Sequence, residues 1–190
     1  RGNVIKEEDD ASSDHKELSI GSQTKKSVII ALSNFRTDEQ EWMEMADDRS
    51  KLRLGRYKRI AELVNQAIKL TPKPDYLVFP ELSVPIAWID AISAKLMSEG
   101  ISLIAGTEYR HYPPEDQEGK KIISEACLVL SDDRLGFPSW VKIWQPKLKP
   151  AVGEEKDLVS KFGRTWASPT EANSEKNKRR IYNHNGLYFG

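Results

Sequence analysis

Two charged side chains lie in apolar stretches of the sequence, where a charge requires an explanation. Glu81 follows the apolar run at residues 76–79 and a proline, and Lys142 lies between Val141 and Ile143. An apolar setting suits a carboxylate that works as a general base near neutral pH, and a fixed ammonium group can stabilise an oxyanion. Glu81 is therefore a candidate base, and Lys142 is a candidate cation for a developing negative charge.

Each of these residues also has a purely structural interpretation. Glu81 could cap the helix that follows it, since a carboxylate near a helix N-terminus interacts well with the free amides there. Lys142 could point outward at a sheet edge, which is the commoner place for a strand lysine. Lys147 and Lys149 lie among prolines, and we expect both to be solvated.

The elements that must position these residues alternate between strands and helices. Apolar runs indicate strands, and apolar residues at three- and four-residue steps indicate amphipathic helices. This order predicts a sheet with parallel neighbours, and helices can cover only one of its faces. The other face must pack on a second sheet or on further sequence, so the expected fold class is α/β with a layered sheet. The predicted order is strand 27–35, loop 36–51, helix 52–70, a strand ending at Glu81, helix 85–100 and strand 101–109.

The second half of the chain changes from helical crossovers to a meander. The runs "ISEACLVLSDD" and "PSWVKIWQP" read as two strands joined by a hairpin-like turn. Residues 147–176 show little periodicity and are expected to form a long surface loop. The end of the chain predicts a hairpin that turns at Asn185-Gly186, with His184 as a turn residue.

Composition excludes several classes of protein. Lys plus Arg and Asp plus Glu both number 29, so no overall field attracts nucleic acid or an anionic membrane. One cysteine and three scattered histidines make a disulfide framework and a structural zinc site improbable, and we expect no cofactor. No signal peptide or membrane span is evident, so we expect a cytoplasmic protein.

The ends of the chain suggest a piece of a longer protein. Residues 1–25 mix charges with Ser, Gly and Asp and are expected to form a flexible arm or linker, while residues 26–190 form one domain. The chain starts at Arg1 and stops within "GLYFG", which looks like the start of a strand.

Six segments in order resemble the nitrilase superfamily of carbon–nitrogen hydrolases. The resemblance covers about residues 27–190 and lies in the order of a Pro-Glu, an Ala-Gly, a Lys-x-x-x-Pro and a Gly-Glu. It implies a four-layer α-β-β-α sandwich, incomplete in this chain, and homo-oligomers formed through helix faces. The segments are "VIIALSNF", "DYLVFPEL", "ISLIAGTEY", "ACLVLSDD", "WVKIWQPKLKPAVGEEKDL" and "IYNHNGLYFG".

The same resemblance implies a Glu-Lys-Cys triad that acts on a small amide, carbamoyl compound or nitrile through a thioester. Glu81 matches the general base and Lys142 matches the lysine that holds the tetrahedral intermediate. Glu154 matches a second, supporting glutamate, with Glu155 as the alternative register.

The nucleophile is where the chain departs from the family pattern. The only cysteine, Cys127, precedes the lysine and is expected to pack as a small hydrophobe. The nucleophile is therefore expected outside these 190 residues. An alternative is a non-catalytic binding or assembly module of a larger protein, such as an antiviral reverse transcriptase joined to a nitrilase-like domain. The basic cluster at residues 176–180 could contact nucleic acid, although such a cluster is more often solvated.

Overall fold

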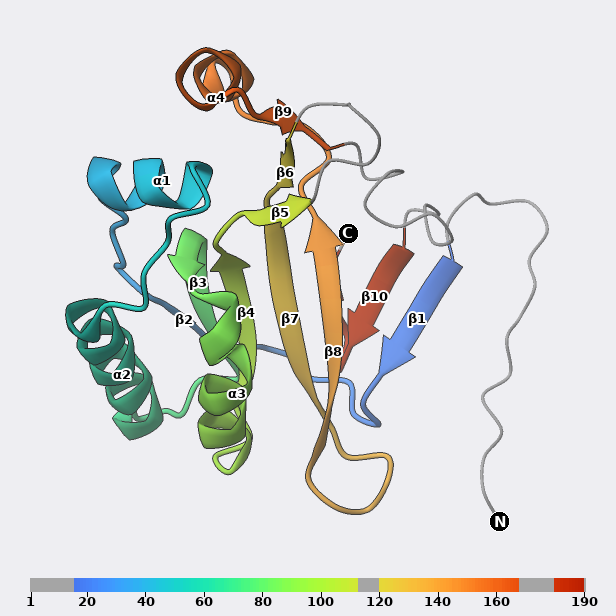
Figure 1. The fold of residues 1–190 in the computed structure, drawn as a ribbon. Helices are drawn as coiled ribbons and strands as arrows, with labels where there is room; N and C mark the ends of the chain where they lie inside the picture. The colour runs from blue at the N-terminus through green and yellow to red at the C-terminus, as the bar shows by residue number, and fades with distance from the viewer. Residues whose placement is uncertain (1–15, 113–119, 168–179, 190) are drawn as a thin grey trace.

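The computed structural model of the chain describes residues 16–112, 120–167 and 180–189, and it shows a mixed α/β protein with three mixed sheets (Figure 1). Its elements in chain order are β1 (Lys16–Ile20), β2 (Ile30–Leu32), α1 (Glu39–Ala46), α2 (Leu54–Lys69), β3 (Tyr76–Val84), the 3-10 turn η1 (Ile86–Trp88), α3 (Ile89–Met97), β4 (Ser102–Thr107), β5 (Arg110–Tyr112), β6 (Lys121–Ile123), β7 (Glu125–Asp132), β8 (Ser139–Pro146), α4 (Glu154–Phe162), β9 (Thr165–Trp166), β10 (Arg180–His184) and β11 (Leu187–Phe189).

The central sheet has the order β2-β3-β4-β7-β8. β2, β3 and β4 pair in parallel, whereas β7 is antiparallel to both β4 and β8. The parallel neighbours and the β7–β8 hairpin confirm the topology expected from the sequence. Because β8 reverses β7, it runs in the same direction as β3 and β4, and its carboxyl end reaches the same edge of the sheet.

Both faces of the central sheet are covered. Helices α2 and α3 pack on one face, where Ile60, Val64 and Leu96 meet Leu77 and Leu103 in one buried cluster. The sheet β1-β10-β11 covers the other face, as Figure 1 shows on the side opposite the helices. Of the two alternatives that the sequence left open for this face, packing on a second sheet is the one observed, and the described residues form an α-β-β arrangement. These three layers do not by themselves show the four-layer sandwich that the resemblance implies.

A third buried cluster closes the carboxyl end of the parallel strands. Met45 of α1, Leu82 of β3, Tyr109, Ile122 of β6 and Leu158 of α4 pack together there. In Figure 1 this end lies at the top, where α1, α4 and the small sheet β5-β6-β9 gather. The cluster supports the loops that carry the candidate site.

Two helices occupy segments that we expected to be loops. α1 lies within residues 36–51 and begins with a capping box, in which the Asp38 carboxylate accepts from the Glu41 amide (2.7 Å) and Glu41 accepts from the Asp38 amide (3.3 Å). α4 lies within residues 147–176 and is anchored by the buried Leu158. Both helices are short, and burial against the third cluster stabilises them.

The N-terminal segment also departs from expectation. Within residues 1–25, which we expected to be an arm, residues 16–20 form β1 and pair in parallel with β10, and Ile20 is buried between the sheets. Residues 1–15 lie outside the described part of the chain. A partner strand so distant in sequence leaves no local signal of such a pairing.

The final hairpin is confirmed, but the expected role of His184 is wrong. β10 and β11 pair antiparallel around Asn185 and Gly186, which both have positive φ angles (51° and 89°) as a two-residue hairpin requires. His184 is 2 % exposed and contacts the Tyr76 hydroxyl through Nδ1 (2.6 Å) and the Ser131 carbonyl through Nε2 (2.7 Å). It is a buried link between the two sheets.

Among the helices that the structure describes, none combines the length and the apolar character needed to cross a membrane.

Candidate functional site

Glu81 lies at an irregularity near the carboxyl end of β3. The register with β4 shifts between Phe79 and Val84. Leu82 has a φ of 58°, a backbone conformation that residues other than glycine rarely adopt. Gly106 of β4 faces this irregularity, and a Cβ there would lie 2.4 Å from the Pro80 carbonyl oxygen and 2.5 Å from the Glu81 Cα. Only glycine permits this approach, so the Ala-Gly of β4 shapes the backbone that carries Glu81.

Lys147 is the cation that contacts Glu81. It follows the last residue of β8, and its Nζ donates to both Glu81 oxygens (3.0 and 3.3 Å) and to Glu154 Oε2 (2.8 Å). The Ser124 hydroxyl also donates to Glu81 Oε1 (2.8 Å). Burial alone would lower the pKa of Lys147, but its bonds to Glu154 and Glu81 outweigh burial and raise the pKa. Lys147 is therefore held as an ammonium ion between two carboxylates.

Glu154, the first residue of α4, holds Lys147 from the other side. Its Oε2 accepts from the Ala151 amide (2.6 Å) and its Oε1 accepts from the Tyr109 hydroxyl (2.7 Å). Burial tends to raise the pKa of Glu154, but the bonds from Lys147, Tyr109 and Ala151 dominate and lower it. Burial and the bond to Glu154 raise the pKa of Tyr109. Glu155 is exposed, so Glu154 is the glutamate that reaches the cluster.

A pocket of about 440 Å³ opens over this cluster. Helix α1 and the loop before it contribute one wall, and the residues around Glu81 and Lys147 contribute another. The Lys147 ammonium also lies 5.5 Å from the centre of the Trp166 ring. The lining residues are Thr37, Asp38, Glu39, Trp42, Glu81, Leu82, Tyr109, Lys147, Ala151 and Glu154.

The structure does not bring Lys142 to this pocket. Lys142 lies in the middle of β8, where it is paired with Val129 of β7, and its ammonium forms an ion pair with Asp90 of α3. Side chains alternate between the two faces of a sheet, and the contact with Asp90 shows that Lys142 lies on the face covered by the helices. It is therefore far from the end of the strand where Glu81 lies. The prediction that Lys142 acts together with Glu81 is therefore wrong, and Lys147 is the lysine that contacts Glu81. The prediction that Lys147 is solvated is also wrong, because only 27 % of its side chain is exposed.

Cys127 lies in the core, as expected. It is 0 % exposed and pairs with Ala105 in the sheet, and burial raises the pKa of its thiol to about 12. A thiol in this setting is protonated at neutral pH and is out of reach of the pocket. The chain's only cysteine therefore does not serve the Glu81 cluster.

The cluster suits proton transfer and charge stabilisation rather than metal binding. Within residues 16–112, 120–167 and 180–189, no group of three or more His, Cys, Asp or Glu side chains is placed to hold a metal ion. Lys147 stands between the two glutamates and occupies the point at which their oxygens converge. Glu81 can exchange a proton with a group in the pocket, and Lys147 can donate to an oxygen there.

Comparison with known proteins identifies no relative: no family model matches the chain, and neither a curated protein nor a solved structure shows significant similarity to it.

Sequence reasoning missed Lys147, Tyr109 and Ser124. The predicted hairpin of β7 and β8 was not a sufficient signal for Lys147, because the direction of β8 relative to β3 depends on how β7 pairs with β4. Tyr109 and Ser124 carry no signal either, because their contacts depend on how β4, β7 and α4 pack. The basic cluster at 176–180 has no described side chains.

Proposed function

We propose that this chain is the greater part of a nitrilase-like carbon–nitrogen hydrolase domain. The observation that carries the proposal is the contact of Lys147 with both Glu81 and Glu154 at the carboxyl end of β3, beneath a pocket. Ligands of open α/β sheets gather at this end of the strands. The substrate class is a small amide, carbamoyl compound or nitrile.

The proposed reaction assigns one role to each charged residue. Glu81 accepts the proton of an attacking thiol as its sulfur bonds to the amide carbon, and Lys147 donates to the oxyanion that forms. Collapse expels the amine, which takes the proton from Glu81, and leaves a thioester. Water then attacks the thioester while Glu81 accepts a proton from the water. The thiolate leaves and takes this proton back from Glu81, which restores the starting state. Glu154 orients Lys147 throughout.

The thiol must come from outside these 190 residues, because Cys127 is buried and is the only cysteine. We therefore assign the activity to the complete parent protein, in the cytoplasm. A helical layer over β1-β10-β11 would complete the four-layer sandwich, and the outward Ile181 and Tyr188, which are 36 % and 60 % exposed, support such a cover. Exposed Leu54 and Tyr57 on α2 support pairing of two copies through helix faces.

The test uses the parent protein with a panel of short aliphatic amides, N-carbamoyl compounds and nitriles. We expect ammonia release together with an acyl adduct detectable by mass spectrometry. Glu81→Gln and Lys147→Ala should each reduce turnover by about 10²-fold or more. Lys142→Ala is the matched control, and it should stay within about threefold because its ammonium contacts Asp90.

The same burial of Cys127 supports a second candidate, a non-catalytic binding or assembly module of a larger protein, such as an antiviral reverse transcriptase fusion. In that case compounds from the panel would raise the melting temperature without any ammonia release. Absence of both turnover and acyl adduct in the parent protein would reject the hydrolase.

A further inference from the structure

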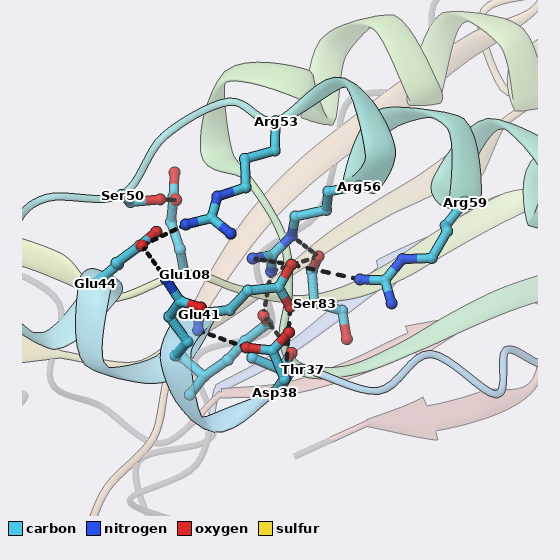
Figure 2. A network of polar contacts seen from close by, with 12 residues as sticks. Thr37, Asp38, Glu41, Glu44, Ser50, Arg53, Arg56, Arg59, Ser83 and Glu108 are labelled. Carbon is cyan, nitrogen blue, oxygen red and sulfur yellow. Dashed lines mark hydrogen bonds and ion pairs between the residues drawn. The ribbon is translucent and has the colours of Figure 1, made fainter.

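The backbone that follows Glu81 is held by a buried arginine from another element. We propose that Arg56 of α2 is a positioning residue for Glu81. Arg56 acts on Glu81 by binding the carbonyl groups of the two residues that follow it, Leu82 and Ser83. The inference rests on the proposed function, because it gives a role in the Glu81 site to a residue outside the pocket. Figure 2 shows Arg56 beside Ser83, between α2 and α1.

Arg56 supplies the hydrogen bonds that β4 does not make with the irregular part of β3. Its Nε and Nη2 donate to the Ser83 carbonyl (3.2 and 2.9 Å), and Nη2 also donates to the Leu82 carbonyl. The register shift between Phe79 and Val84 takes these carbonyls out of the ladder. A guanidinium has a planar fork of donors that can serve two adjacent carbonyls, whereas an ammonium group cannot match that geometry.

Arg56 is buried, so its hydrogen bonds must offset the cost of removing its charge from water. The residue is 5 % exposed, and its nearest carboxylate, that of Glu41, lies 3.9 Å from Nη1. Burial lowers the pKa of Arg56, while the charges of Glu41 and Glu108 oppose the change. A charge buried this deeply is tolerated only when its donors find partners. Here the carbonyls of Leu82 and Ser83 accept from Nε and Nη2, and Nη1 faces Glu41.

The same arginine connects both walls of the pocket. Thr37, which lines the pocket, donates through its hydroxyl to the Leu82 carbonyl (2.9 Å), the atom that Arg56 also contacts. Glu41 of α1 lies 3.4 Å from Arg59, and Glu44 pairs with Arg53, so α2 holds α1 at several points (Figure 2). Loss of Arg56 should make the backbone at Leu82 more mobile, and the Glu81 side chain should then no longer be held in its present orientation.

Arg56 could instead be a purely structural residue, and the two roles are separated by a local readout at Lys147. The experiment measures acetylation of each lysine in the native chain by sulfo-N-hydroxysuccinimide acetate, quantified by mass spectrometry and normalised to the exposed Lys58. A lysine held between two carboxylates stays protonated and reacts slowly, so displacement of Glu81 should accelerate its acetylation. Lys73, which pairs with Glu99 elsewhere, reports any general loosening.

We expect Glu81→Gln to raise the acetylation rate of Lys147 by about three- to tenfold, since one unit of pKa is a tenfold change in free amine. Arg56→Met should raise it at least about threefold, Arg56→Lys less, and Thr37→Val about twofold. Arg59→Met is the matched control, because Arg59 shares the Glu41 contact but bonds neither Leu82 nor Ser83. It should acetylate at the wild-type rate to within about 1.3-fold.

The outcomes separate the two ideas. No change in Glu81→Gln would reject the Lys147 cluster and with it the proposed function. A normal rate in folded Arg56→Met, beside a raised rate in Glu81→Gln, would overturn the role of Arg56 alone. An equal rise in Arg59→Met, or a parallel rise at Lys73, would overturn it as well. If Arg56→Met does not fold, an unchanged rate in folded Arg56→Lys overturns the proposal.

Discussion

Gly106 lies so close to the backbone of Glu81 that a methyl group at its Cα would meet the Glu81 Cα at 2.5 Å. Gly106→Ala should therefore destabilise the fold by about 1–3 kcal/mol, because the atoms it meets are backbone atoms that cannot rotate away. Urea unfolding followed by circular dichroism measures the change. Gly55→Ala is the control: its Cβ meets nothing within 4 Å, and the helical site should gain up to about 1 kcal/mol. Equal stability of Gly106→Ala and wild type would contradict the close approach.

Removal of Lys147 should destabilise the protein in a pH-dependent way. Lys147→Met leaves Glu81 and Glu154 without their shared cation, and we expect a loss of about 1–2 kcal/mol at pH 7. Because the folded pKa of Glu154 is lowered, its stabilising contribution is present above the unfolded value of about 4.3 and is lost as the pH falls through the folded value. The difference between variant and wild type should thus shrink below about pH 4. Lys73→Met, at an exposed pair, should change stability less at neutral pH. A difference that is constant across pH would argue against the ion pair.

His184 should make the stability of the fold fall on acidification. Burial lowers the pKa of His184, while the Ser131 carbonyl and the charges of Asp132 and Asp133 oppose this shift and Lys25 adds to it. The unfolded chain therefore binds the extra proton first, and stability should decline as the pH drops below about 6.5, levelling off below the folded pKa. Urea midpoints between pH 5 and 8 measure this slope. His184→Gln should have a shallower slope over that range, and an unchanged slope would show that another group is responsible.

Cys127 should be inert in the folded chain. Its thiol is buried and burial raises its pKa to about 12, so the reactive thiolate is scarce at neutral pH. We expect Ellman's reagent to react at least about 100-fold more slowly with the native chain than with the chain in concentrated urea. Comparable rates in the two conditions would mean that the thiol is accessible and could serve as a nucleophile after all.

Local patterns were sufficient for the regular elements. The apolar period of residues 52–70 predicted α2, and the run before Glu81 predicted β3. The pair Asn185-Gly186 predicted the last hairpin, because a tight two-residue turn needs positive φ angles at both positions. The capping box at Asp38 and Glu41 was also readable and would have placed α1.

Elements stabilised by distant partners were not predictable in the same way. β1 exists through its pairing with β10, and α4 exists through burial of Leu158 against the third cluster. Their free energy comes from contacts whose sequence separation no local window spans.

The sequence by itself determined that a carboxylate follows the apolar run at residues 76–79 and that the only cysteine lies inside a strand. The expected end of the strand at Glu81 is wrong, because β3 continues to Val84. Only the tertiary structure decided which lysine meets that carboxylate. β8 runs parallel to β3, so its end, and not its middle, reaches the edge where Glu81 lies. Lys147 therefore contacts Glu81 and Glu154, while Lys142 pairs with Asp90, because strand direction and side-chain alternation are set by how the strands pair.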